Sequence, residues 1–296
     1  MDRRGFLLGT GLVLVVGCAR VAPTEPGTAA PSPSAASLAI GSDGSPSGAL
    51  LAELLCLAVR AKGSTATVAL AGADWQASLD DGSLTALPAY ATTLWSLLSD
   101  DTEPPAGVDA VLSDVAGLLA PEVSMLAAAK VDGGLEWLVT PSTAKGGITS
   151  LDRIGAWSKG RVVGVPPVAA SRADGIPGIT EVYHATFTTA SIANPGQRAA
   201  QLASGKVALA AFRRTEYTGV PGLVALADPD KLQTADPLVV LLGAAFADAD
   251  PDAVLAMNGV ATILTTDMLL GLQGEVAGGA AVTDVAGRWL KANGLA

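Results

Sequence analysis

Residues 41–48 carry the first side chains whose types and spacing could bind a ligand. The segment reads GSDGSPSG and lies between an expected short strand and an expected helix. Ser42, Asp43 and Ser45 could direct oxygen atoms at a ligand, and the N–H groups of a helix start could face an anion. The same side chains are also typical helix caps. From the sequence, both interpretations remain open.

Side chains suited to catalysis or metal binding are scarce. His184 is the only histidine, so a Ser–His–Asp triad would need it, yet no G-x-S-x-G nucleophile elbow occurs. One histidine and Cys56 cannot supply a zinc site of the usual kind. No glycine-rich loop precedes a Lys-Ser/Thr pair, so no phosphate-binding loop is expected. We therefore expect no enzyme, no metal site and no cofactor.

Residues 1–17 have the features of a signal peptide. Arg3 and Arg4 precede an apolar run over residues 6–16, which is shorter than the ~20 residues that cross a bilayer. The run ends in Val-Val-Gly-Cys and resembles the bacterial lipobox, in which Cys18 would be acylated. The order Arg-Arg-x-Phe-Leu also resembles a twin-arginine signal, which leaves the export route open. The alternative is an N-terminal core helix with a buried cysteine.

Residues 18–37 are predicted to be a disordered tether. They are rich in Pro, Ala and Ser and lack an apolar period, so they cannot offset the entropy of ordering. A diacylated Cys18 supplies the two chains that stable anchoring in a lipid bilayer requires. We therefore expect a body held on the extracytoplasmic face of the cell membrane.

The composition limits the partners of that body. Its roughly 260 residues are enough for a large core or two lobes. The formal net charge of the full sequence is −10, and this negative charge argues against nucleic acid or anionic lipid as the main partner. Cys56 lies among leucines and is expected to be a small buried hydrophobe.

From residue 38 onward, short strands alternate with helices. The stretches SLAIG, ATVAL, GLEWLVT and RVVGVPP predict strands, and helical apolar spacing occupies residues 48–63, 149–160 and 194–205. This alternation indicates parallel βαβ units. Residues 108–130 are expected to be helical with a break at Pro121, and the chain becomes purely helical after about residue 250.

Four stretches in order carry a family resemblance. They are residues 40–63, residues 80–98 with the segment LTALPAYATT, residues 161–187 with SRADG, and residues 256–295 with the closing WLKANGL. Together they resemble the substrate-binding lipoproteins of ABC importers for glycine betaine, choline and related osmoprotectants. The resemblance spans nearly the whole mature chain.

The resemblance implies an α/β, two-lobed periplasmic-binding-protein-like fold (type II), with hinged lobes and a central ligand cleft. Lobe 1 would comprise residues 38–140 and lobe 2 residues 141–235. Residues 236–296 would return to lobe 1 and form the C-terminal helices. Lobes of this kind close by hinge motion around a ligand.

The resemblance also nominates ligand-binding residues in both lobes. Arg172 lies where the family has an Arg that holds the ligand carboxylate, and a planar guanidinium suits that task. The alternative is a surface Arg paired with Asp174. Thr215 and Glu216 match a Thr-Asp pair of the family. Arg213, beside Arg214, adds positive charge near the cleft unless it is a solvated strand end.

The aromatic box that family members use for trimethylammonium groups looks incomplete here. Tyr90 matches the second Tyr of the family's Y-P-E-Y segment and Thr93 matches its last Thr. The first Tyr is replaced by Leu87. The retained Arg with missing tyrosines puts betaine itself in doubt.

Two functions follow from these residues. The first is a membrane-anchored solute-binding lipoprotein, expected to be monomeric, that binds a small polar or zwitterionic solute for an ABC permease. The solute would be like glycine betaine or choline, or related to them. The second is a degenerate relative that acts as a scaffold or sensor with a protein partner. An open cleft with Arg172 pointing inward would favour the first function, and a filled cleft would favour the second.

Overall fold

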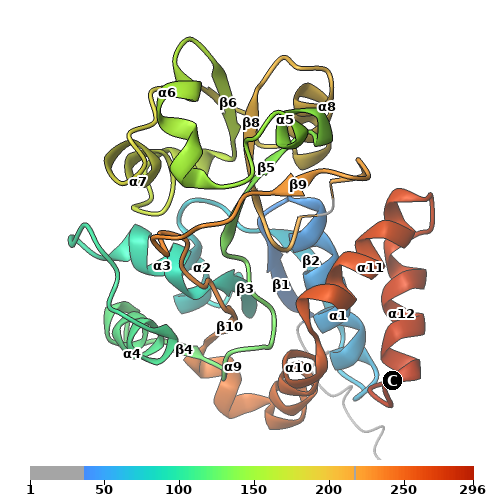
Figure 1. Cartoon of the computed structure of the whole chain (residues 1–296). Coiled ribbons are helices and arrows are strands. Elements are labelled where there is room, and N and C mark those ends of the chain that lie inside the picture. The colour runs from blue at the N-terminus through green and yellow to red at the C-terminus, as the bar shows by residue number, and fades with distance from the viewer. Residues whose placement is uncertain (1–36, 217) are drawn as a thin grey trace, which may run out of the picture. The chain divides into compact units, whose positions relative to one another are not determined.

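The computed structural model describes residues 37–216 and 218–296, and these fold around two five-stranded β-sheets (Figure 1). The predicted signal peptide, Cys18 and most of the predicted tether lie outside the described residues, as does Tyr217. We call each sheet with its helices a lobe.

Lobe 1 is built from both ends of the described chain. Its sheet has the order β2-β1-β3-β10-β4, in which β1 runs parallel to β2 and β3 while β10 runs antiparallel to β3 and β4. The strands are β1 (Leu38–Ser42), β2 (Ala66–Leu70), β3 (Ala86–Tyr90), β4 (Val123–Met125) and β10 (Leu238–Gly243). The helices are α1 (Pro46–Arg60), α2 (Trp75–Asp80), α3 (Ala91–Leu98), α4 (Val108–Leu118), α9 (Ala244–Ala249), α10 (Pro251–Ile263), α11 (Thr266–Ala277) and α12 (Val282–Ala292).

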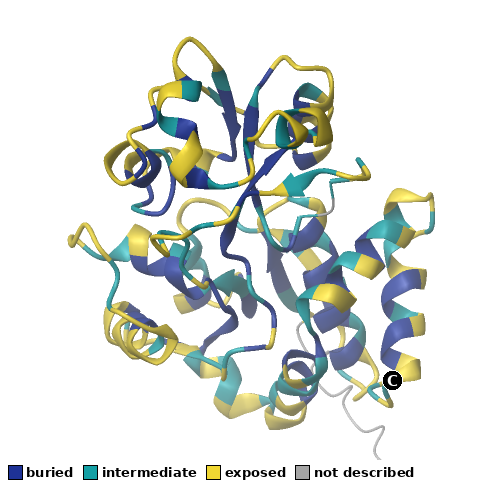
Figure 2. Cartoon of the chain, viewed as in Figure 1, coloured by how far each residue is buried: buried dark blue, intermediate teal, exposed yellow. Residues whose placement is uncertain are grey.

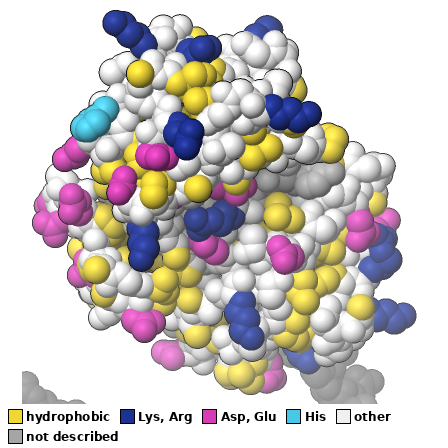
Figure 3. Space-filling view, in the orientation of Figure 1, with side chains coloured by type: hydrophobic (Ala, Val, Ile, Leu, Met, Phe, Trp, Pro, Cys, Tyr) yellow, Lys and Arg dark blue, Asp and Glu magenta, His cyan; other side chains and the backbone are white. Residues whose placement is uncertain are grey.

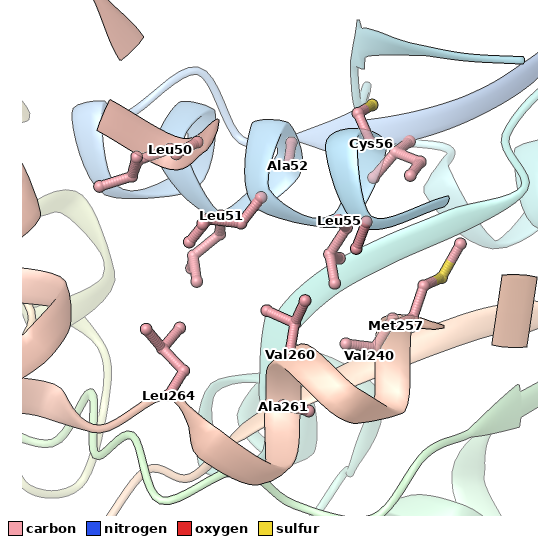
Figure 4. Packing of buried hydrophobic residues seen from close by; sticks show 14 of the residues in the cluster. Leu50, Leu51, Ala52, Leu55, Cys56, Val240, Met257, Val260, Ala261 and Leu264 are labelled. Atoms are coloured by element: carbon pink, nitrogen blue, oxygen red, sulfur yellow. The ribbon is translucent and has the colours of Figure 1, made fainter. Parts of the chain in front are cut away.

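Helix α1 organises one side of lobe 1. Ser45 caps it by accepting a hydrogen bond from the Gly48 N–H, and Pro46 occupies the first turn, where a missing N–H costs nothing. Its leucines pack against α10 and α12, as Figure 4 shows for Leu51 and Leu55 opposite Val260 and Met257. Cys56 is fully buried in this cluster, as expected of a small hydrophobe.

Lobe 2 is formed by the middle of the chain. Its sheet has the order β7-β6-β8-β5-β9, in which β6 runs parallel to β7 and β8 while β5 runs antiparallel to β8 and β9. The strands are β5 (Leu135–Val139), β6 (Val162–Val165), β7 (Thr188–Ser191), β8 (Leu209–Arg213) and β9 (Val224–Ala225). The helices are α5 (Pro141–Lys145), α6 (Ile154–Ser158), α7 (Ile176–Glu181) and α8 (Pro195–Ala203), with 3₁₀ turns at Leu151–Arg153 and Pro167–Ala170.

The two lobes have separate hydrophobic cores. The buried clusters of lobe 1 draw on residues up to 131 and from 238 onward, whereas those of lobe 2 draw on residues between 135 and 232. Figure 2 shows buried stretches inside each lobe, with exposed residues over the outer helices and loops. The predicted α/β fold with two lobes is confirmed.

Three expectations about the elements need correction. The lobe boundary predicted at residue 140 falls after β5, but β5 pairs with β8, so the chain enters lobe 2 before Leu135. Residues 123–125 form β4 rather than a helix, because Val123 is buried where this strand pairs with β10. The sheets are mixed rather than purely parallel, since β5 and β10, the strands that follow each crossing between lobes, run antiparallel to their neighbours.

Among residues 37–216 and 218–296, no helix combines the length and apolar character needed to cross a bilayer.

Candidate functional site

Two chain segments cross between the lobes side by side. Asp132 and Pro237 form an antiparallel bridge, and the Gly133 N–H donates to the Asp236 carbonyl oxygen at 2.8 Å. The Asp236 N–H in turn donates to Oδ1 of Asp132 at 2.8 Å. The first crossing segment thus carries Asp132 and Gly133, and the second carries Asp236 and Pro237. The bonds between the segments hold Asp236 between the two hydrophobic cores.

The Asp236 carboxylate is the centre of the contacts at this crossing. Its Oδ1 accepts from the N–H groups of Thr92 at 2.7 Å and Thr93 at 3.1 Å, in the first turn of α3. Its Oδ2 accepts from Thr93 Oγ1 at 2.6 Å, Arg172 Nη1 at 2.6 Å and Arg213 Nη1 at 3.0 Å. Burial alone would raise the pKa of Asp236, but the charges of Arg213 and Arg172 lower it. The carboxylate is therefore ionised at neutral pH.

Arg172 reaches this carboxylate from the loop before α7 in lobe 2. Its Nε and Nη2 donate to the two oxygens of Asp174, each at 2.7 Å, in a bidentate pair. Its Nη1 also donates to Thr93 Oγ1 at 2.9 Å, across the junction of the lobes. Burial by itself lowers the pKa of Arg172, but the hydrogen bonds and charges of Asp174 and Asp236 raise it overall. Arg172 is thus buried and points inward, although it does pair with Asp174.

Arg213, the last residue of β8, lies over the ring of Tyr90. Its guanidinium carbon is 4.8 Å from the ring centroid, a cation–π distance. Its Nη2 donates to Thr93 Oγ1 at 3.0 Å, and its Nη1 donates to the Gly133 carbonyl at 3.3 Å as well as to Asp236. Arg213 is therefore not a solvated strand end; that role fits Arg214 better, which is partly exposed and pairs with Asp132 at 2.5 Å.

Thr215 provides a further link between the lobes. Its Oγ1 accepts from the Tyr90 hydroxyl at 2.9 Å, and its carbonyl accepts from Gln273 Nε2 at 2.7 Å. Thr215 is fully buried. The predicted residues Tyr90, Thr93, Arg172, Arg213 and Thr215 are thus brought together, and we call them, with Asp236, the junction cluster.

The other predicted ligand residues satisfy one another locally. Ser42 Oγ accepts from the Gly44 N–H at 3.1 Å, and Asp43 Oδ1 accepts from both the N–H and the hydroxyl of Ser45. Because Ser45 caps α1, these three contacts match the capping interpretation. Glu216 accepts from Arg198 and from the Arg213 N–H inside lobe 2.

The sequence interpretation missed Asp236 as part of the site. Between Lys231 and β10 the chain has no aromatic residue that would mark a binding site for a cationic group. An acidic residue directly before Pro237 and a buried strand was the available signal. Its partners lie 23 to 144 residues away, so no local pattern could reveal them.

The open space described for lobe 2 lies away from the junction cluster. A cavity of about 450 Å³ in lobe 2 is lined by residues including Thr140, Trp157, Arg161 and Ser204, and it shares no residue with the junction cluster. Figure 3 shows basic side chains beside acidic ones at the level where the lobes meet. Within the described part of the chain, no three His, Cys, Asp or Glu side chains are grouped to hold a metal ion.

Neither a protein-family model nor a curated protein sequence matches the chain. Solved structures do match it over most of its length. A glycine betaine/carnitine/choline ABC transporter structure aligns with a TM-score of 0.70 at 17% identity, covering 87% of this chain and 99% of that one. An ABC-transporter choline-binding protein in complex with choline gives 0.64 at 14% identity, covering 87% and 88%.

The glycine betaine/L-proline-binding protein ProX from Borrelia burgdorferi gives a TM-score of 0.63 at 14% identity, covering 87% of this chain and 94% of that one. At these identities the likeness concerns the fold, and it agrees with the resemblance carried by the four sequence stretches. The chain has the two-lobed α/β fold of the substrate-binding proteins of ABC transporters.

Proposed function

We propose that the chain is an extracytoplasmic solute-binding protein that delivers a small polar or zwitterionic solute to the permease of an ABC importer. The observation that carries the proposal is the convergence of Tyr90, Thr93, Arg172 and Arg213 where the lobes meet. An aromatic face, a hydroxyl and two guanidinium groups suit a solute that carries an anionic group beside a cationic one. The mechanism is lobe closure around the solute and involves no covalent chemistry.

Attachment to the membrane through Cys18 is part of the proposal. The apolar run before Cys18 and the Pro- and Ser-rich segment after it support this attachment. The variant Cys18→Ala should move the protein from the membrane fraction to the soluble extracytoplasmic fraction and abolish labelling by radioactive palmitate. Cys56→Ala is the matched control, which should stay in the membrane fraction. Membrane retention of Cys18→Ala would contradict the proposed anchor.

Solute binding is tested on the full chain isolated from its native membrane. Native mass spectrometry should reveal a co-purified solute and thereby name its class. In parallel, thermal unfolding is followed with glycine betaine, choline, carnitine and amino acids. A solute at a hundredfold excess over its dissociation constant should stabilise the fold by about 2.7 kcal/mol. No co-purified solute and no stabilisation across the panel would count against the proposal.

A scaffold or sensor that binds a protein partner is the second candidate. It is favoured by a specific observation, namely that the Asp236 carboxylate already occupies the donors of Thr93, Arg172 and Arg213. For this function, the lobes need not open at all. Cross-linking in intact cells distinguishes the two: a scaffold should give a stable partner other than a permease, with no co-purified solute.

A further inference from the structure

The junction cluster places five hydrogen-bond donors around one carboxylate. Two are N–H groups in the first turn of α3, one is the Thr93 hydroxyl, and two are the guanidinium groups of Arg172 and Arg213. A carboxylate has about four lone-pair positions, so this set fills its accepting capacity. The set is a complete carboxylate-binding site, and its occupant is the chain's own Asp236.

The aromatic face next to this site is also occupied from within. The guanidinium of Arg213 covers Tyr90 at 4.8 Å from the ring centroid, where the cationic group of a zwitterionic solute would be attracted. The same guanidinium is 3.0 Å from the Asp236 carboxylate. Arg213 and Asp236 therefore present a positive and a negative charge side by side, as a small zwitterion does.

The contacts of this pair depend on closure of the lobes. Asp236 is bound to α3 of lobe 1 through its Oδ1, whereas Arg172 and Arg213 belong to lobe 2. Moving lobe 2 away would separate Arg172 and Arg213 from both Asp236 and Thr93. The pair thus makes the contacts between the lobes that a bridging solute otherwise makes.

We propose that Arg213 and Asp236 are specificity-determining residues that act as a built-in zwitterion, holding the lobes closed without a solute and competing with zwitterionic carboxylates for the site. The inference rests on the proposed function, in that the junction cluster is taken as the solute site. A solute enters only when it brings a carboxylate that replaces Asp236. A cation without a carboxylate, such as tetramethylammonium, brings no anionic group to take the place of Asp236 beside Arg172. It therefore does not replace the Arg213–Asp236 pair.

The apparent affinity for such a solute is the intrinsic affinity of the open state multiplied by the fraction of molecules that are open. With an open state populated at about 10% or less, removing Asp236 should tighten the apparent dissociation constant for glycine betaine about tenfold or more.

The test follows the distance between the lobes in the full chain. Spin labels are placed at exposed positions in α4 and α7 through Asp109→Cys and Glu181→Cys, with Cys18→Ser and with Cys56 left buried. With Asp236 intact, the label pair should give one short distance that glycine betaine, acetate and tetramethylammonium at equal concentration leave unchanged. In Asp236→Ala, the distance should lengthen or broaden, and acetate or glycine betaine should restore it, whereas tetramethylammonium chloride should not.

Glu216→Gln is the matched control. It also removes a carboxylate from a buried arginine, Arg198, but that pair lies within lobe 2, so the distance should stay short. Where Asp236→Ala does not fold, as judged by circular dichroism, Arg213→Gln takes its place. It should broaden the same distance because the lobes lose the contacts to Tyr90, Thr93 and Asp236.

The outcomes separate this inference from the proposed function. A short distance that persists in Asp236→Ala, or one that acetate fails to restore, would overturn the inference. A chain with intact Asp236 that is open and closes only with its solute would also overturn it, while supporting solute delivery. Restoration by acetate together with no solute for the unmodified chain would support the built-in zwitterion and contradict solute delivery.

Discussion

Arg172 donates from Nη1 to Oδ2 of Asp236 at 2.6 Å, and both side chains are almost completely buried. The two residues are 64 positions apart and belong to different parts of the fold, the loop before α7 and the second crossing segment. Arg172 also holds Asp174 of the same loop with both remaining nitrogens, which orients the guanidinium so that Nη1 ties lobe 2 to the crossing segment at Asp236. The pair is therefore the central ionic contact between the lobes.

Removal of Arg172 should be strongly destabilising. Arg172→Ala leaves the buried carboxylates of Asp174 and Asp236 without this partner, and breaking a buried pair typically costs about 3–5 kcal/mol. Urea unfolding followed by circular dichroism measures the change. The exposed pair Arg288–Glu275 is the control, and Arg288→Ala should cost about 1 kcal/mol or less. Equal losses from the two variants would contradict the structural role of Arg172.

The Tyr90–Thr215 hydrogen bond should contribute a measurable coupling between the lobes. Tyr90→Phe and Thr215→Val each remove one partner of the 2.9 Å bond while keeping the size of the side chain. A double-mutant cycle in urea should give a coupling energy of about 1 kcal/mol. A coupling energy near zero would show that this bond does not stabilise the folded chain.

The contribution of Asp236 should depend on pH in a defined direction. The pKa of Asp236 is lowered in the folded chain, so its stabilising effect is present above the unfolded pKa of about 3.9 and is lost as pH falls through the folded pKa. The difference in unfolding free energy between the unmodified chain and Asp236→Asn should therefore be constant from pH 7 to 5. It should shrink below about pH 4. A difference that grows on acidification would have the wrong sign.

Cys56 should report on global unfolding. Its side chain is fully buried, and burial raises the pKa of the thiol to about 12, which suppresses the reactive thiolate. In a Cys18→Ser chain, a thiol reagent should modify Cys56 only at the rate at which the protein unfolds. The rate should rise in urea in parallel with loss of the circular dichroism signal. Rapid modification of the native chain would mean that the core around α1 opens locally.

The alternation of strands and helices could be predicted from the sequence, because the spacing of apolar residues follows the period of the local helix or strand. β2 was predicted at its observed bounds, and α1 was predicted from its leucine face. The strand β4 was missed because three residues after a helix carry too little pattern, and only pairing with β10 defines it. The antiparallel direction of β5 and β10 was missed for the same reason, since strand direction depends on where the chain crosses between lobes.

The resemblance of short stretches to the binding-protein family nominated Tyr90, Thr93, Arg172, Arg213 and Thr215, and these residues do gather at the junction. Which carboxylate pairs with Arg172 and Arg213 at the junction was decided by the tertiary fold. Asp236 meets Thr92 across 144 residues, and the strength of its ion pairs depends on removal from water, which no linear pattern records. Charge pairing is a property of distances and solvent exclusion in three dimensions, so the occupant of the site emerged only once the two lobes and their crossing segments were assembled.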